Sequence, residues 1–216
     1  ILKLKPKKVF EIGCGTGIML FLLIKQIESY DGIDFSDRTF KEIKRKLKTL
    51  KISRPDKLRQ ASTNNFEHLL SKKHDLVLIN SVTQYLPSIG YLERLLKKIL
   101  RSTENSSKIF LGDIRNLDTF PEFIRKKRGN NKITSFTEEI ERENEEELLI
   151  SPKYFIQLKE KTPEISEISL LYRNYNKKND PRELKNLVVH CNKNRRKVYI
   201  SNNLKDAIKY NFDGLY

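Results

Sequence analysis

The sequence predicts an α/β protein of three layers, in which a mostly parallel sheet lies between two layers of helices. Three observations indicate this class. Segments typical of strands and helices alternate along most of the 216 residues. Leu76–Ile79 is continuously apolar, as expected of a strand that is buried on both faces of a parallel sheet. A glycine-rich turn directly joins the first expected strand to the first expected helix.

The elements of the first half follow from hydrophobic pattern and capping. Val9–Ile12 is a short apolar strand, and the mostly apolar stretch 18–27 after the glycine turn is a helix. A second strand holds residues 32–34. Ser36 then caps a helix with apolar side chains at helical spacing, at Phe40, Ile43, Leu47 and Leu50. The remaining expected elements here are strands at 58–61, 76–79 and 109–111 and a helix at 91–99.

The second half has a less regular pattern. Residues 120–128 and the acidic stretch 136–149 are expected to be helices, and Ser151-Pro152 is typical of a helix start. Strands at 165–171 and 187–191 flank a loop rich in Asn, Lys and Asp, which favours an antiparallel C-terminal hairpin at the edge of the sheet. We expect one domain over residues 1–192 and a basic C-terminal extension over 193–216.

Composition limits the class of protein. The chain has 43 Lys and Arg against 28 Asp and Glu, a formal net charge of +15, which would attract nucleic acid, anionic lipid or an acidic protein. The lysines and asparagines are scattered along the whole chain, so a general compositional bias explains the charge better than selection for an anionic partner. The two cysteines, Cys14 and Cys191, form no disulfide framework or CxxC metal motif, which favours a reducing, cytoplasmic location and predicts no metal site.

Other classes are also excluded by simple length arguments. The longest apolar stretch, Ile18–Ile24, is too short to cross a bilayer, so no membrane association is expected. The chain does not begin with Met and reaches a strand almost at once. We therefore expect a fragment of something longer.

The residues that point to chemistry lie in Glu11-Ile-Gly13-Cys14-Gly15-Thr-Gly17, between a strand and a helix. Glycines let the backbone bend sharply and approach a ligand, and a helix N-terminus offers free N–H groups. The spacing GxGxG differs from the dinucleotide fingerprint GxGxxG, and no Lys-Ser/Thr follows as in a P-loop. Asp34 ends the second strand, where a carboxylate can accept both hydroxyls of a ribose.

This constellation resembles the class I S-adenosylmethionine-dependent methyltransferases, which have a three-layer Rossmann-like sheet. The resemblance implies that the glycine loop holds the methionine part of the cofactor and that Asp34 holds its ribose. Residues after the third strand would meet the adenine; an aspartate is usual there, whereas this chain has Asn64-Asn65. The implied cofactor-binding set is Glu11, Gly13, Cys14, Gly15, Gly17, Asp34, Phe35, Ser36, Asn64, Asn65, Asn80 and Ser81.

Three further blocks are similar to the N-methyltransferase domains embedded in nonribosomal peptide synthetases. They are Asn80–Pro87 with Tyr91-Leu92, Leu111–Leu117, and Glu145–Phe155. The resemblance implies methyl transfer to the amine of an aminoacyl or peptidyl intermediate, possibly on an acidic carrier protein, beside neighbouring synthetase domains. The N-terminal helices that cap the cofactor cleft in this group have no counterpart before the first strand.

Methyl transfer to an amine needs alignment more than acid–base machinery, because an α-amino group titrates at about 7.7–8.0. Asn80 and Ser81 leave the fourth strand at the edge where open α/β sheets bind ligands. We assign them to the boundary between cofactor and acceptor. Tyr85 is the candidate for orienting the acceptor, with core packing as the alternative. Asp113 is the candidate for holding the acceptor amine, with a structural ion pair to Arg115 as the alternative.

Two other functions remain open. The net charge of +15 favours a nucleic-acid methyltransferase, although Asn80–Thr83 lacks the prolines of the N-P-P-Y-like segment that grips a flipped base. The missing cap and the unusual Asn64-Asn65 favour a non-catalytic methyltransferase-fold remnant, for which we expect a cofactor pocket filled by side chains.

Overall fold

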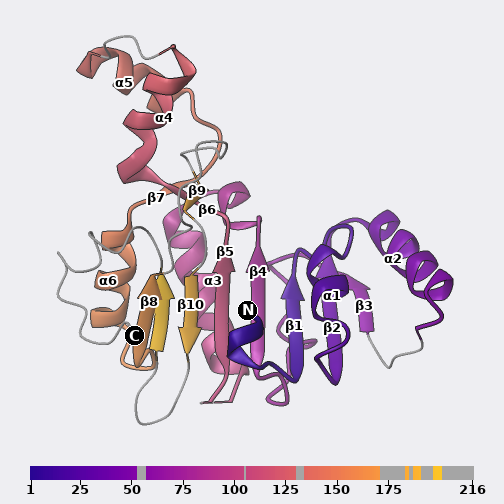
Figure 1. Ribbon diagram of the computed structural model, residues 1–216. Coiled ribbons are helices and arrows are strands. Elements are labelled where there is room, and N and C mark those ends of the chain that lie inside the picture. Colours follow the sequence, from indigo (N-terminus) through magenta and orange to yellow (C-terminus); the bar gives the residue numbers. More distant parts are fainter. Residues whose placement is uncertain are drawn as a thin grey trace.

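The fold is built on a central sheet with the strand order β11-β8-β10-β5-β4-β1-β2-β3 (Figure 1). The computed structural model describes residues 1–52, 57–104, 106–129 and 134–170, and the backbone of strands at 183–184, 187–190 and 197–200. The sheet strands are β1 (Lys8–Ile12), β2 (Ser29–Asp34), β3 (Lys57–Gln60), β4 (Leu76–Asn80), β5 (Lys108–Gly112), β8 (Glu167–Leu170), β10 (Leu187–His190) and β11 (Lys197–Ile200).

The strands β1 to β5 all run parallel, so their C-terminal ends meet at one edge. The order reverses at β1, since β2 and β3 lie on one side of it and β4 and β5 on the other. Open α/β sheets bind ligands outside the C-terminal ends of the strands at such a reversal. The predicted α/β class with a mostly parallel sheet is confirmed.

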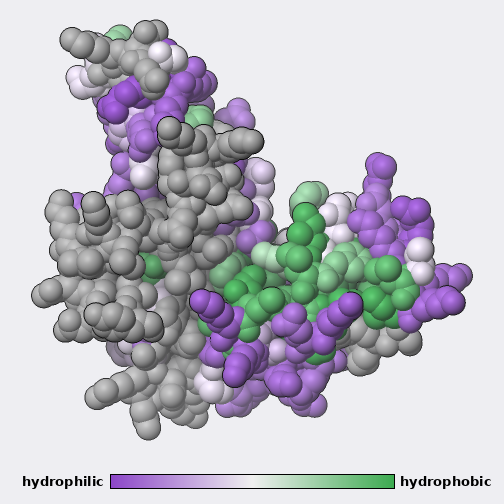
Figure 2. Space-filling model, in the orientation of Figure 1, coloured by the Kyte–Doolittle hydropathy of each residue, from purple (hydrophilic) through white to green (hydrophobic). Residues whose placement is uncertain are grey.

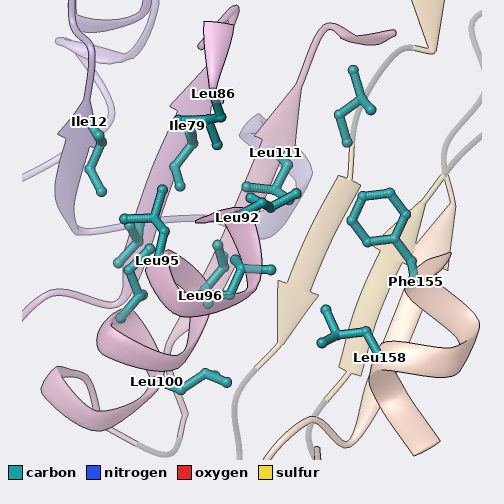
Figure 3. Packing of buried hydrophobic residues seen from close by; sticks show 14 of the residues in the cluster. Ile12, Ile79, Leu86, Leu92, Leu95, Leu96, Leu100, Leu111, Phe155 and Leu158 are labelled. Carbon is teal, nitrogen blue, oxygen red and sulfur yellow. The ribbon is translucent and has the colours of Figure 1, made fainter. Parts of the chain in front are cut away.

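Helices cover both faces of the sheet, as the three-layer prediction requires. The helices α1 (Ile18–Leu23) and α2 (Asp37–Thr49) pack on one face, over a cluster that includes Val9, Leu78 and Phe110. The helices α3 (Ile89–Ser102) and α6 (Pro152–Lys161) pack on the other, over a larger cluster (Figure 3). Alternate strand residues therefore face opposite layers, which is why most side chains of β1 and β4, such as Val9, Phe10 and Leu76–Ile79, are apolar.

The helix α3 shows how pattern and capping produce these elements. Its apolar residues recur at helical spacing, and Leu92, Leu95, Leu96 and Ile99 are all buried under the strands (Figure 3). The Ser88 hydroxyl accepts a hydrogen bond from the Tyr91 N–H at 3.2 Å and so caps the first turn.

A smaller sheet of β6 (Ile114–Asn116), β7 (Leu149–Ile150) and β9 (Glu183–Leu184) lies beyond β5. From its edge α4 (Phe120–Lys127) and α5 (Ser135–Glu143) project away from the central sheet (Figure 1). The predicted helix 136–149 is wrong at its end: α5 stops at Glu143, and Leu149 pairs with Arg115 as part of β7. Continuation of the helix would place the like charges of Glu143 and Glu147 four residues apart, which weakens a helix, while pairing with β6 satisfies the backbone of β7.

At the C-terminal end, the strand β11 adds to the sheet beside β8. The division into a domain at 1–192 and an extension at 193–216 stays a prediction. The strand β10 runs antiparallel to β5 and to β8. Residues 171–182, which would join the two strands of the expected hairpin, lie outside the described residues, so the hairpin connection stays a prediction. Among the described helices, none has the length and apolar character to span a bilayer.

Candidate functional site

A cavity of about 420 Å³ opens at the C-terminal edge of the sheet, beside the glycine loop. Its size falls in the usual range for small-ligand sites. The walls come from the loop after β1, from the ends of β2 and β4, and from the chain just after β3. The lining residues are Glu11, Ile12, Gly13, Cys14, Gly15, Thr16, Ile18, Met19, Ile33, Asp34, Phe35, Ala61, Ser62, Thr63, Asn80, Ser81, Val82, Tyr85 and Leu86.

The glycine loop is held against the end of β2 by its backbone. The N–H groups of Gly13 and Cys14 both donate to the Ile33 carbonyl, at 2.8 and 3.1 Å. Gly13 has a φ of +76°, and a Cβ atom there would lie 2.3 Å from the Val82 side chain across the cavity wall. Only glycine therefore allows the loop to bend here and to approach the segment after β4 so closely. Gly17 serves as the N-cap of α1 and lies outside the cavity lining.

Asp34, at the end of β2, is buried and joins the glycine loop to the turn before α2. Its Oδ2 atom accepts from the Gly15 N–H at 2.8 Å, and its Oδ1 atom accepts from the Ser36 N–H at 3.0 Å. Asp34 and the exposed Phe35 both line the cavity, whereas Ser36 is the N-cap of α2 and does not. The carboxylate of residue 34 therefore faces the bend, as the sequence predicts, and is itself part of the support of the loop.

Glu11 lies on the floor of the cavity and is only 2% exposed. Burial raises the pKa of its carboxyl from 4.5 to about 8; the Tyr30 hydroxyl, which donates to Oε2, opposes the rise, and the nearby Asp34 adds to it. Burial, together with the charges of these two carboxyls, also raises the pKa of the Cys14 thiol. Cys14 is thus a small neutral filler of the loop rather than a reactive thiolate.

The ends of β4 and β5 are joined by a small polar cluster. The Asp113 Oδ2 atom accepts from the Ser81 hydroxyl and, at 3.4 Å, from the Asn80 amide. Ser81 and Asp113 have φ angles of +57° and +56°, an unfavourable conformation for residues with side chains. Gly112 makes the contact possible, since a Cβ atom there would lie 2.0 Å from the Asn80 Oδ1 atom. Asn80 and Ser81 line the cavity, and Asp113 stands behind them.

Tyr85 lies at the mouth of the cavity in the short helix η2 (Thr83–Tyr85). Its side chain is 74% exposed, so the alternative of core packing is wrong. The neighbouring Gln84 is buried, and its carbonyl accepts from the Leu148 N–H at 2.7 Å. The position of Tyr85 is therefore fixed by a segment more than sixty residues further along the chain.

Arg115 pairs with Glu147 and not with Asp113, so the expected alternative of an Asp113–Arg115 ion pair is not what the structure contains. The Arg115 Nε and Nη2 atoms bind the two oxygens of Glu147, at 2.5 and 3.2 Å. Both side chains are mostly buried. The partner was missed because 32 residues separate the two in sequence, and only the pairing of β6 with β7 brings them together.

We expect Glu147→Gln to lower the free energy of unfolding by about 1.5–3 kcal/mol, because a forked hydrogen bond to a charged group is lost from a mostly buried site. Urea denaturation measures this change. The matched control is Glu138→Gln, which removes an i,i+4 pair with Arg142 on the more exposed α5 and should cost about 0.3–0.5 kcal/mol. Equal losses for the two variants would contradict a structural role for the Arg115–Glu147 pair.

The three sequence blocks that resemble one subgroup thus converge at one edge of the sheet. Ser81 of the first block contacts Asp113 of the second, Arg115 of the second binds Glu147 of the third, and Leu148 of the third binds Gln84 of the first. These contacts link the three blocks to one another beside the cavity, which the first block lines.

Asn64 and Asn65, expected near the adenine, lie outside the cavity lining. The Asn64 Oδ1 atom instead accepts from the Tyr91 hydroxyl at 2.6 Å. The cavity is lined there by Ala61, Ser62 and Thr63. A signal for these three residues was present in the sequence: they directly follow the third strand, and the first residues beyond a parallel strand lie at the ligand-binding edge.

The cavity and its surroundings differ in charge. Among the described residues that line it, Glu11 and Asp34 are acidic and none is Lys, Arg or His. Figure 2 shows apolar surface gathered over α1, beside the hydrophilic surface of α2. The exposed apolar side chains there include Ile18, which lines the cavity, and Leu22. The basic character of the chain therefore does not extend into the cavity.

Comparison with known proteins agrees with this geometry. Residues 10–106 match a family model described as "Methyltransferase domain". Chondramide synthase cmdD from Chondromyces crocatus is 32% identical over 178 residues, which is 76% of this chain and 4% of that protein. The nonribosomal peptide synthetase TES from Alternaria alternata is 33% identical over 169 residues, 74% of this chain and 3% of that protein. The chain thus spans only a few per cent of the length of these relatives.

The fold comparison agrees as well. The N-methyltransferase NodS from Bradyrhizobium japonicum WM9 superimposes with a TM-score of 0.55, over 92% of this chain and 91% of that one, at 13% identity. This likeness concerns the fold, which matches the mostly parallel sheet and its covering helices. The chain belongs to the class I S-adenosylmethionine-dependent methyltransferases, as the matched family model, the relatives named above, the glycine loop and the acidic end of β2 together show.

Proposed function

We propose that this chain transfers a methyl group to the amine of an aminoacyl or peptidyl intermediate in nonribosomal peptide-type biosynthesis. The observation that carries the proposal is that the first subgroup block lines the cavity with the glycine loop and Asp34, while the other two blocks are joined to it by hydrogen bonds. The similarity of most of the chain to peptide synthetases supports the same acceptor class.

The cavity suits S-adenosylmethionine in shape and in chemistry. Gly15 leaves open space beside the backbone, since a Cβ atom there would meet nothing within 4 Å, and Asp34 and Glu11 supply acidic groups beside it. In this proposal the glycine loop holds the methionine part, Asp34 the ribose, and Ala61–Thr63 the adenine end. The bound cofactor supplies an electrophilic methyl group on a sulfonium centre.

The protein's own contribution is alignment and exclusion of water. Asn80 and Ser81 stand between cofactor and acceptor, held by Asp113 from behind. Tyr85 orients the acceptor amine from the mouth of the cavity through its hydroxyl. An α-amino group titrates at about 7.7–8.0, so a sufficient unprotonated fraction is present near neutral pH without a strong base.

The test is incubation with methyl-labelled S-adenosylmethionine and three acceptor sets: carrier-bound aminoacyl groups, free amines and RNA. We expect label on the carrier-bound amines. Tyr85→Phe should lower kcat roughly tenfold or more and leave cofactor affinity unchanged, because it removes only a hydroxyl at the exposed mouth. Label on RNA alone, with binding that falls steeply with salt, would replace this proposal by the nucleic-acid alternative.

The open cavity argues against the third alternative, a non-catalytic remnant, for which a filled pocket is expected. Failure to bind S-adenosylmethionine in calorimetry would revive that alternative. The carrier protein and the neighbouring synthetase domains belong to this proposal, and they are tested by the carrier-bound arm of the experiment.

A further inference from the structure

The charge inside the cavity is opposite to the charge of the chain. The formal net charge of the protein is +15, yet the described lining residues include two carboxyl side chains, those of Glu11 and Asp34, and no Lys, Arg or His. A cavity wall of low dielectric strengthens such a local field. The cavity therefore favours a positively charged ligand over a neutral one of the same shape.

Glu11 is the lining residue whose ionisation should respond most strongly to a positively charged ligand, because of its surroundings. It is buried in β1, between Gly32 of β2 and Leu78 of β4. The titratable groups that interact with it, among the described residues, are Tyr30 and Asp34 from β2 and Cys14 from the loop. None of these described groups carries positive charge, so a bound cation would supply the compensating charge that they lack.

We propose that Glu11 is the specificity-determining residue that distinguishes the cationic methyl donor from its neutral product. The carboxyl releases its proton when a sulfonium ligand occupies the cavity and takes up a proton again when only a thioether remains. This inference rests on the proposed function, because it assumes that the cavity holds the donor.

The charge balance of the transfer explains why this would matter. The acceptor nitrogen forms a bond to the methyl carbon while the carbon–sulfur bond breaks, and its electron pair stays on sulfur. The positive charge thus leaves sulfur and appears on the acceptor nitrogen, which then loses a proton to solvent. An ionised Glu11 would lose its compensating charge in this step, so the product is bound less well than the donor.

The linkage has a definite sign. The carboxyl of Glu11 has a pKa of about 8 in the folded protein without ligand, so it is mostly protonated at pH 7. If a cation lowers that pKa by two units or more, donor binding releases nearly one proton at pH 7. The donor affinity should then rise about fivefold or more per pH unit between pH 6 and 7.5 and level off above pH 8.

The experiment is titration calorimetry of the full chain with S-adenosylmethionine and with S-adenosylhomocysteine, in phosphate and in Tris buffer at pH 7. Two buffers of different ionisation enthalpy give the number of protons released. We expect the donor to release at least half a proton more than the product. Both ligands carry the same α-amino group, so its own titration largely cancels in the difference.

Two variants separate titration from structure. Glu11→Gln keeps an acceptor for the Tyr30 hydroxyl and should abolish both the extra proton and the pH dependence of the donor-to-product affinity ratio. Tyr30→Phe removes a hydrogen bond that favours the ionised carboxyl, so the same pH dependence should move to higher pH. A merely structural role of Glu11 would not produce such a shift.

The outcomes distinguish failure of the proposed role of Glu11 from failure of the proposed methyltransferase function. Equal proton counts for donor and product would overturn the role of Glu11 while leaving the methyltransferase proposal intact. Absence of donor binding would overturn both. If Glu11→Gln does not fold, which circular dichroism reports, the proton count of the wild-type protein still gives the answer.

Discussion

Gly13→Ala is expected to weaken S-adenosylmethionine binding at least a hundredfold, or about 2.7 kcal/mol. Two effects add. The φ of +76° costs a residue with a Cβ atom about 1–2 kcal/mol, and the new methyl group would lie 2.3 Å from Val82. Because Val82 is itself a lining residue, the required shift narrows the cavity. Calorimetric titration of the variant measures the loss.

Gly15→Ala is the matched control for this prediction. Gly15 also has a positive φ, +45°, but a Cβ atom there meets nothing within 4 Å. It therefore carries the backbone strain without the collision, and its effect on binding should be at least tenfold smaller. Equal effects of the two variants would show that strain alone, and not the contact with Val82, explains the need for glycine at residue 13.

Asp34→Asn should lower both the donor affinity, by tenfold or more, and the free energy of unfolding, by about 1.5–3 kcal/mol. The carboxylate accepts from two backbone N–H groups, those of Gly15 and Ser36. An amide offers one acceptor oxygen and turns an NH₂ group toward the other N–H, so one of these bonds is lost. The glycine loop then loses its tie to β2, and the ribose loses its charged partner.

Asp31→Asn provides the comparison on the same strand. Asp31 accepts from the Lys57 N–H at 3.2 Å and contacts His74 at 3.2 Å, but it does not line the cavity. Its replacement should reduce stability, measured by urea denaturation, and leave donor affinity within a factor of two. Should Asp31→Asn weaken donor binding as much as Asp34→Asn, the assignment of Asp34 to the ribose would be refuted.

Local sequence patterns predicted most of the central sheet. The strands β1, β4 and β5 and the helices α2, α3 and α6 lie where apolar runs, helical spacing and caps placed them. These signals are strong because each element buries one continuous face. Short elements that depend on a distant partner were missed: β6 and β7 have two or three residues each, and they pair with one another across more than thirty residues of sequence, while β6 also pairs with β9.

The candidate site divides in the same way. The glycine loop and Asp34 were recognisable because they are close in sequence, and because three closely spaced glycines indicate a backbone bend that residues with a Cβ atom rarely adopt. The contribution of Ala61–Thr63 was missed in favour of Asn64 and Asn65, because residue chemistry was weighted above distance from the strand end. The side chain of Asn64 is instead engaged by Tyr91 on α3.

The sequence by itself determined the α/β class, the position of the glycine loop after β1, and Asp34 as the acidic residue beside that loop. Short-range periodicity and glycine spacing encode these features directly. Only the tertiary structure decided which polar groups face one another. It joined Ser81 to Asp113 and Arg115 to Glu147, and it left Glu11 and Asp34 together in a cavity without a described basic side chain. Such contacts depend on how parallel strands bring distant residues to one edge, and no local pattern records that.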